Sequence, residues 1–347
     1  MAINLSTKSA QELTLKTALE NSVIAGSFTD GFNFTGAKTI EIITPVSQPL
    51  NDYKRSGSNR YGNAEELQDI KQTLVLSQDK SYAITVDKGN FRDQNDLKKI
   101  EKVIKMQQAE RVIPTYDKYC LDKIAHKAGK INSNTTAPTK ATICDRISAG
   151  TEWLDNHEVS SEGRTLFISA TNYKLLRLSD EFDKSDALIT KSLTKGVVGT
   201  YDNMKVVKVP ASRMPKGVNF IIAQKNSWTA PKVISEAKVH KDPPGISGNL
   251  LEGRDYFDCF VIGARCNGIY ADVSEAATTA PTVQENGTVG TVGGATVYYT
   301  TDGSDPRYSS TVKTGTLGAQ EAGTVVSAYA EKEGGWASDV VTVVATA

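Results

Sequence analysis

The 347-residue chain has no long hydrophobic run. It contains no stretch of about eighteen consecutive apolar residues, the length at which a membrane-spanning helix becomes a candidate. Its N-terminal residues also lack the charged segment followed by an apolar run that marks a signal peptide. These absences argue against the membrane and secretory classes. They predict a protein that folds in the cytoplasm and has no membrane partner.

Cysteine and histidine are also scarce. The four cysteines, Cys120, Cys144, Cys259 and Cys266, are scattered, and no two form a CxxC pair. This spacing argues against a disulfide framework or a zinc site and predicts buried, reduced thiols. The three histidines occur singly and without an HExxH motif, so we expect no metal-binding or catalytic role for them.

Sequence motifs that carry catalysis are missing. The chain has no GxSxG elbow and no GxxxxGK[ST] loop, and the glycine-rich stretch 287–296 lacks the lysine and the following helix of a phosphate site. Asp302 and Asp305 lie in TTDGSDP, which is too short for a full calcium cage and is typical of a turn. We therefore expect no enzyme activity, no metal and no cofactor.

Neither sign of charge is in excess. Lys+Arg and Asp+Glu each number 40, so the formal net charge is zero. Without a bulk field to hold a polyanion, a dedicated nucleic-acid binder is not expected. A hydrophobic share of 39% and a charged share of 23% suit a soluble globular protein, and the length predicts two or three folded units.

The first ninety residues are poor in apolar side chains. Apolar residues between positions 13 and 24 predict a short helix, either on an extended arm or packed in its own domain. A β-branched run follows at 39–46, and residues 72–87 predict two short strands around Asp79-Lys80-Ser81. A two-stranded ribbon is marginal in water by itself, so we expect it to lie on another subunit.

A long helix is predicted from Asp93 to Ala128. Apolar residues recur there at three-and-four spacing, Asp93 can cap its start, and Gly129 can end it. The helix would span about 54 Å, and Pro114 should kink it. Beyond it, residues 141–249 predict a mixed region with helices at 143–154 and 171–178, the second opened by a threonine cap, a hairpin turning at Asp202-Asn203, and several strands. A further strand is predicted at 256–264.

Several segments in order resemble the major capsid proteins of tailed bacteriophages, which have the Hong Kong phage-type fold. One is TIEIITPVSQPLNDYKRSG, with Asp52, Tyr53 and Arg55 in the loop. The others are LSQDKSYAITVDKGNFRDQN, GRTLFISATNYKLLRLSDEF, KGVVGTYDNMKVVKVPASRMP and GNLLEGRDYFDCFVIGARCNGIYAD, with Phe257 where tyrosine is usual. The resemblance covers about residues 36–272.

This resemblance implies an α+β fold made of an N-terminal arm, an extended hairpin loop, a spine helix and an axial α/β domain. The expected boundaries are 1–38 for the arm, 39–92 for the loop, 93–140 with 250–275 for the peripheral domain, 93–128 for its spine helix, and 141–249 for the axial domain. The lysine and asparagine that some members use for covalent cross-linking cannot be placed in this sequence, so the resemblance implies nothing about a cross-link.

The last residues resemble a second family. Short strand-like runs recur there every eight to twelve residues, which is typical of an all-β sandwich. Residues 279–347 resemble the immunoglobulin-like module at the C-terminus of chitobiases and hexosaminidases, where it is an accessory to the enzyme. On a capsid it would be an outer decoration domain. The residues that carry this resemblance are Tyr298, Tyr299, Thr300, Asp302, Gly303, Asp305 and Pro306.

The capsid resemblance also implies partners. The expected ones are other copies of the chain in hexamers and pentamers, a separate scaffold protein, a portal protein, and packaged double-stranded DNA contacted non-specifically. The shell would assemble in the host bacterial cytoplasm. The side chains expected at contacts between subunits are Tyr53, Arg55, Leu74, Leu76, Tyr82, Ile84 and Val86.

Two other interpretations remain open. A cell-wall glycan hydrolase with an accessory module is suggested by residues 279–347 and by the abundant carboxylates. A tail or fibre adhesin would use the same module to bind a surface, and would form trimers or rings rather than closed shells.

Overall fold

A computed structural model of the chain describes residues 22–29, 38–45, 52–56, 60–61, 69–88, 100–179 and 197–346. Contacts divide the chain into two units. The first contains Leu76–Ala277 together with the short segment Gly334–Ala337. The second contains Thr39–Val75, Thr278–Glu333 and Ser338–Ala347.

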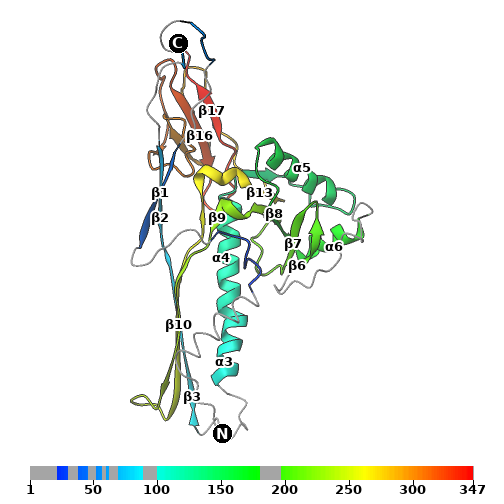
Figure 1. Ribbon diagram of the computed structural model, residues 1–347, viewed down its shortest axis with the longest axis vertical. Coiled ribbons are helices and arrows are strands. Elements are labelled where there is room, and N and C mark those ends of the chain that lie inside the picture. Colours follow the sequence, from blue (N-terminus) through cyan, green and yellow to red (C-terminus); the bar gives the residue numbers. More distant parts are fainter. Residues whose placement is uncertain are drawn as a thin grey trace. The chain divides into compact units, whose positions relative to one another are not determined.

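A six-stranded mixed sheet forms the centre of the first unit (Figure 1). Two of its strands, β5 and β8, pair antiparallel and bury every side chain. Both contain the β-branched and aromatic residues that suit a sheet covered on its two faces. In spatial order the strands are β4 (Lys130–Ser133), β13 (Ile269–Val273), β8 (Val218–Gln224), β5 (Arg164–Ser169), β7 (Met204–Val209) and β6 (Val197–Tyr201).

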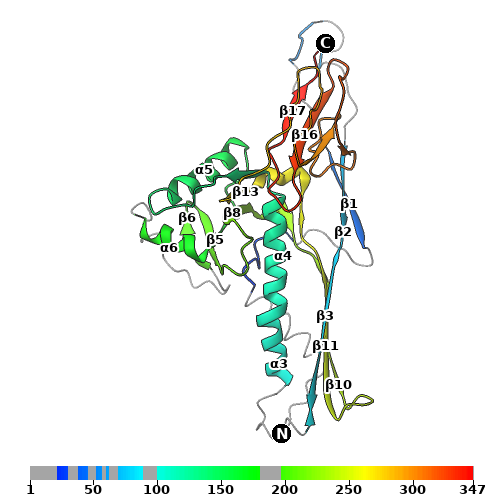
Figure 2. The ribbon, with the colours of Figure 1, turned by 180° about the vertical axis from the view of Figure 1, so that it is seen from behind.

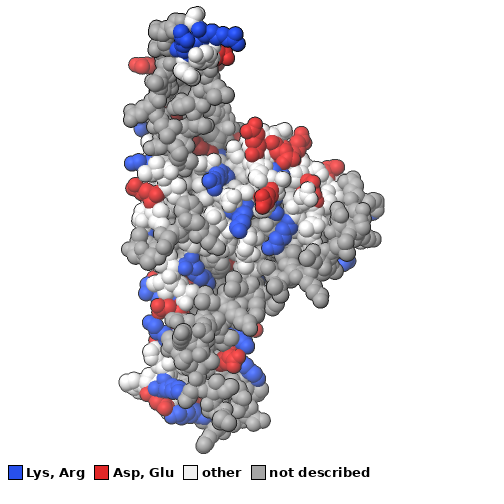
Figure 3. All heavy atoms as spheres, viewed as in Figure 1, with Lys and Arg blue, Asp and Glu red and all other residues white. Residues whose placement is uncertain are grey.

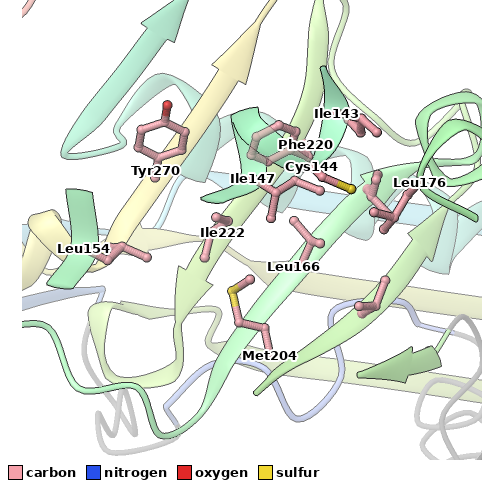
Figure 4. Close-up of a cluster of buried hydrophobic side chains, with 12 residues drawn as sticks. Ile143, Cys144, Ile147, Leu154, Leu166, Leu176, Met204, Phe220, Ile222 and Tyr270 are labelled. Carbon is pink, nitrogen blue, oxygen red and sulfur yellow. The ribbon is translucent and has the colours of Figure 1, made fainter. Parts of the chain in front are cut away.

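Two helices enclose a core on one face of this sheet (Figure 4). They are α5 (Ile143–Asn156) and α6 (Ala170–Leu178). They pack on alternate residues of the strands, because side chains along a strand point to opposite faces in turn. Each large side chain buried here contributes about 1.5–3 kcal/mol relative to exposure. The cluster includes Ile147, Leu154, Leu166, Leu176, Met204, Phe220, Ile222 and Tyr270.

Most of the predicted elements of this region are confirmed. The hairpin β6–β7 turns at Asp202 and Asn203, whose φ angles of 49° and 57° suit a tight two-residue turn. The cap of α6 differs from the prediction: the Ser169 hydroxyl, rather than a threonine, accepts the Asn172 N–H. The strand predicted at 256–264 is also displaced. In its place are β11 (Gly248–Phe257) and the short β12 (Phe260–Val261), which pairs with β9 (Trp228–Thr229).

The predicted spine helix is present over its described part. Helix α3 (Ile100–Gln107) continues through a π-helical turn (Gln108–Val112) into α4 (Ile113–His126). The π-helical turn is the irregularity that corresponds to the kink expected at Pro114. Proline lacks the backbone N–H that a regular helix interior uses, and the wider turn ends at Val112, two residues before Pro114. The helix ends at His126, earlier than predicted, and the expected Asp93 cap lies outside the described residues.

A three-stranded sheet corrects the prediction for residues 72–87. Strand β3 (Gln78–Asp87) runs without a break through the expected turn at Asp79-Lys80-Ser81. It pairs with β11, which pairs in turn with β10 (Lys232–Lys241). The prediction of two strands folded on each other is therefore wrong. The partner strand comes from a distant part of the sequence, which a local pattern cannot show.

The described N-terminal segment 22–29 belongs to the first unit. The Ser22 hydroxyl and the Val23 N–H both donate to the Asp117 carboxylate, at 2.6 and 3.1 Å. Ile24 is fully buried, and the Phe28 ring lies 5.3 Å from that of Trp228. This part of the arm is therefore anchored in its own subunit. Most of the helix predicted at 13–24 lies outside the described residues.

The second unit contains a ribbon and a four-stranded sheet (Figure 2). In the ribbon, β1 (Thr39–Pro45) pairs antiparallel with β2 (Asp69–Val75). The sheet packs Val297, Tyr299 and Val326 into a small core of its own, as the alternation along its strands predicts. Its strands, in spatial order, are β15 (Lys313–Thr314), β14 (Thr296–Thr300), β16 (Val325–Glu331) and β17 (Val341–Val344).

Candidate functional site: surfaces for assembly

The loop between β1 and β2 presents an exposed aromatic pair. The side chains of Tyr53 and Tyr61 are 52% and 83% exposed, yet their rings meet edge to face with centroids 5.0 Å apart. A backbone hydrogen bond of 2.9 Å from the Lys54 N–H to the Arg60 carbonyl joins the two sides of the loop. Arg55 is exposed beside them. Two of the predicted contact residues, Tyr53 and Arg55, therefore lie together on open surface.

The other five predicted contact residues lie largely in the interior of the chain. Leu74, Leu76 and Val86 are 2%, 1% and 5% exposed. Tyr82 and Ile84 are half-buried and pack on a cluster that includes Ile104 of α3. The apolar face of β3 thus rests on the spine helix of the same chain. A contact of these five residues with another copy stays a prediction.

Tyr82 packs against a glycine, whose lack of a side chain leaves room for the tyrosine ring. Gly253 of β11 is its cross-strand partner, and a Cβ atom at Gly253 would come within 2.2 Å of the Tyr82 ring. The Gln108 amide donates to the Tyr82 hydroxyl at 3.4 Å, from the π-helical turn of the spine. The glycine thus allows the ring to cover the strand and reach the helix.

The opposite face of the same sheet is charged. Arg254 donates to both oxygens of Asp79, at 3.0 and 2.6 Å, and this pairing lowers the pKa of the Asp79 carboxyl. Beside it, Glu236 pairs with Lys238 at 3.0 Å and Glu252 with His240 at 3.1 Å. All six side chains are substantially exposed, so these pairs contribute little stability. These ion pairs make the outer face of the sheet polar, whereas the β1–β2 loop exposes the aromatic rings of Tyr53 and Tyr61.

Two buried carboxylates hold separate segments to the spine helix. Asp117 lies in the apolar stripe of α4 and accepts from Ser22, Val23 and the Arg213 guanidinium, the last at 2.8 Å. Burial raises the pKa of the Asp117 carboxyl, although these donors oppose the shift. Asp258 accepts from the Ser77 hydroxyl at 2.8 Å and from the Tyr119 hydroxyl at 2.7 Å.

Another buried carboxylate, Asp272, lies in the six-stranded sheet. It is 0% exposed and accepts from the side chains of Asn132, Arg146 and Asn219, at 2.9, 3.3 and 2.6 Å. Burial raises the pKa of the Asp272 carboxyl, again against its donors. Sequence reasoning missed these acidic positions. For Asp117, the available signal was an acid spaced four residues from Ile113 and from Leu121 on an apolar helix face.

Little in the described part of the chain points to catalysis. The three buried carboxylates bind donors of their own chain and lie among segments that they hold together. No group of three or more His, Cys, Asp or Glu residues that could hold a metal ion occurs in the described ranges. The four cysteines are buried, as predicted. No helix in the described part of the chain is long and apolar enough to cross a membrane.

The residues that carry the module resemblance form a turn and its flanking strand. Tyr299 faces the module core, whereas Tyr298 stacks on Tyr329 with ring centroids 5.0 Å apart. Asp302 accepts from the Ser304 N–H at 3.0 Å and from the Thr311 hydroxyl at 2.7 Å. Asp305 accepts from Arg307 at 2.6 Å, while Gly303 has a φ of 75° and Pro306 follows. The two carboxylates thus organise the turn.

Comparison with solved structures identifies the fold. The structure of "Mycobacterium phage Che8" matches with a TM-score of 0.57 and 16% identity, over 73% of this chain and 91% of that one. "Mycobacterium phage Bobi" matches at 0.53 and 13%, over 73% and 90%. The "Asymmetric unit of bacteriophage PhiM1 mature capsid" matches at 0.51 and 10%, over 68% and 82%. The chain has the Hong Kong phage-type capsid fold, as the sequence resemblance implied.

Sequence comparison adds the C-terminal module. The family model described as "Fn3 associated" matches residues 289–344, which supports an immunoglobulin-like module there. No curated protein matches the chain. A specific relation to the chitobiase module therefore stays a prediction.

Proposed function

We propose that the chain is the major capsid protein of a tailed bacteriophage. Copies assemble into hexamers and pentamers of an icosahedral shell that encloses double-stranded DNA. The observation that most strongly supports this proposal is the match to capsid structures over more than two thirds of the chain. The role is structural rather than enzymatic. Shell formation in the host cytoplasm, a separate scaffold and a portal protein belong to the same proposal.

The distribution of apolar surface supports assembly. The β1–β2 ribbon leaves Ile43 54% and Val75 45% exposed, and its loop leaves Tyr53 52% exposed. Closed shells use repeated contacts between different patches of identical subunits. Covering these side chains with another copy removes apolar area from water at about 25 cal/mol per Å2, before the costs of association. Tyr53 and Arg55 are the proposed intersubunit contacts on this loop.

Negative-stain microscopy of the expressed chain, alone and with a candidate scaffold protein, tests the proposal. Isometric closed particles are expected. Trimers or open rings under every assembly condition would instead favour an adhesin. Release of sugar from bacterial cell walls would favour the hydrolase interpretation.

The module is proposed to lie on the outer surface of the shell. A suitable test uses the turn at Gly293 and Gly294, where an added side chain would meet no atom within 4 Å. An epitope inserted there should bind its antibody on intact, DNA-filled particles. Antibody binding only after the particles are disrupted would place the module inside.

A further inference from the structure

Part of the loop between β1 and β2 is locally basic, although the whole loop, residues 46–68, contains three cations and three acids. Residues 52–61 contain three cations, Lys54, Arg55 and Arg60, and one acid, Asp52. All four side chains are exposed, and neither Lys54 nor Arg55 forms an ion pair with another residue in the described ranges. In the sequence, Lys54 follows Tyr53 and Arg60 precedes Tyr61, and the two tyrosine rings are exposed and in contact. We call residues 52–56 with 60–61 the basic tip.

A surface of opposite character lies on α5 and the turn that follows it. Between residues 141 and 163 the sequence has five acids and one arginine, in a chain whose net charge is zero. Figure 3 shows acidic side chains gathered over α5. The arginine, Arg146, donates to Asp272 and to the Thr136 carbonyl, at 3.3 and 2.6 Å. The exposed acids, which define the acidic face, are Asp145, Glu152, Asp155, Glu158 and Glu162.

The acidic face also has an aromatic pair. The Trp153 and His157 rings lie 4.0 Å apart in the last turn of α5 and just beyond it. Trp153 is half-buried and His157 is exposed. Glu152 and Asp155 flank Trp153 in the sequence. Each surface therefore combines two neighbouring aromatic rings with several charges, and the charges are of opposite sign.

We propose that the basic tip of one copy docks on the acidic face of a second copy. The inference rests on the proposed shell function and specifies one of its contacts. Opposite potentials attract and orient two surfaces, and like charges placed together are strongly unfavourable. Stacking and cation–π contacts between the tyrosines, the cations and Trp153 add a short-range attraction. A second copy is the favoured occupant because both surfaces occur on the same chain in equal number.

Charge reversal tests the docking. The tip variant Lys54→Glu with Arg55→Glu should reduce the yield of closed shells at least about tenfold, because its new carboxylates would lie opposite the carboxylates of the acidic face. The face variant Glu152→Lys with Glu162→Lys should do the same. Asp155 is left unchanged because it accepts from the buried Arg164 at 2.7 Å. The matched control is Lys313→Glu with Lys332→Glu, two exposed lysines of the module, and should assemble normally.

The decisive variant combines both reversals in one chain. It should recover at least half of the wild-type yield, since each charge again meets its opposite, and a folding defect would not be repaired in this way. Circular dichroism must show that every variant is folded. Wild-type assembly should also weaken as salt rises from 0.15 to 1 M, because the screening length falls from about 8 to about 3 Å.

The outcomes separate the two proposals. If the wild-type chain forms no shells under any condition, the proposed function fails. If it assembles and the tip variant assembles equally well, the docking inference is overturned and the shell function stands. A folded combined variant that stays unassembled also overturns the docking. So does a tip variant that assembles normally but retains less packaged DNA, since the tip would then contact the polyanion.

Discussion

The central sheet of the first unit and the β1–β2 ribbon of the second use similar residues but differ in burial. β5 and β1 each contain three large apolar side chains, and β1 has the larger share of β-branched residues, five of seven against two of six. Every residue of β5 is buried, whereas Thr39, Glu41 and Ile43 of β1 are exposed. β5 has a strand on each side and helices on one face, while β1 has only β2 as its partner among the described strands. Available partners, rather than local hydrophobicity, decide how much of a strand is buried.

The largest expected effect contrasts one apolar residue from each region. Phe220→Ala should lower the free energy of unfolding by about 3–5 kcal/mol, because it leaves a cavity in the core of the six-stranded sheet. Ile43→Ala should change it by less than about 0.5 kcal/mol, since the side chain is already 54% exposed. Urea unfolding of the unassembled chain measures both. Equal losses would remove the contrast between the two regions.

The next effect concerns the anchored N-terminal segment. Asp117→Ala leaves Arg213 and the donors of Ser22 and Val23 without their acceptor, so the loss of stability should be about 3 kcal/mol. Amide hydrogen exchange at residues 22–29 should be faster in this variant than in the wild-type chain. The control is Asp122→Ala on the exposed side of the same helix, for which a loss below about 0.5 kcal/mol is expected. Unchanged exchange in Asp117→Ala would show that other contacts hold the segment.

A smaller effect is expected at Gly253. Gly253→Ala should cost about 1–3 kcal/mol, because the new methyl group displaces the Tyr82 ring. When Tyr82→Ala is already present, the same change should cost much less, and the two losses should not add. Gly318→Ala is the control, since a Cβ atom there meets nothing within 4 Å. Additive losses in a double-mutant cycle would contradict the proposed packing.

The smallest effect depends on pH and lies in the module. Burial of Asp302 is outweighed by hydrogen bonds from Ser304 and Thr311, which lower the pKa of its carboxyl below the ordinary value of 3.8. The carboxylate therefore stabilises the fold fully above about pH 4, and this contribution disappears as the pH falls through the lowered pKa. Asp302→Asn should cost about 1 kcal/mol at pH 7 and less at pH 2.

Thermal unfolding at the two pH values, followed by the near-ultraviolet signal of the tyrosines, measures the difference. Asp52→Asn, at an exposed position in the ribbon loop, is the control and should show no such difference. An equal loss for Asp302→Asn at both pH values would mean that shape, rather than charge, makes Asp302 useful in the turn.

Sequence patterns predicted the elements whose partners lie nearby. The spine helix, α5, the β6–β7 hairpin and β5 all follow from short-range periodicity and turn residues. The pairing of β3 with β11 joins segments far apart in the chain, so no local pattern shows it. The exposed residues Tyr53 and Arg55 were identified through the family resemblance. The buried carboxylates were not predicted, because an acidic residue within an apolar pattern does not show which groups will donate hydrogen bonds to it.

Amide hydrogen exchange of β1 and β2, compared between the unassembled chain and purified shells, tests the central claim most directly. The account predicts fast exchange in the free subunit, where the ribbon has few partners, while β5 and β8 are already protected. In shells, the ribbon amides should slow at least about a hundredfold. Full protection of the ribbon in the isolated subunit, with no change on assembly, would contradict the account.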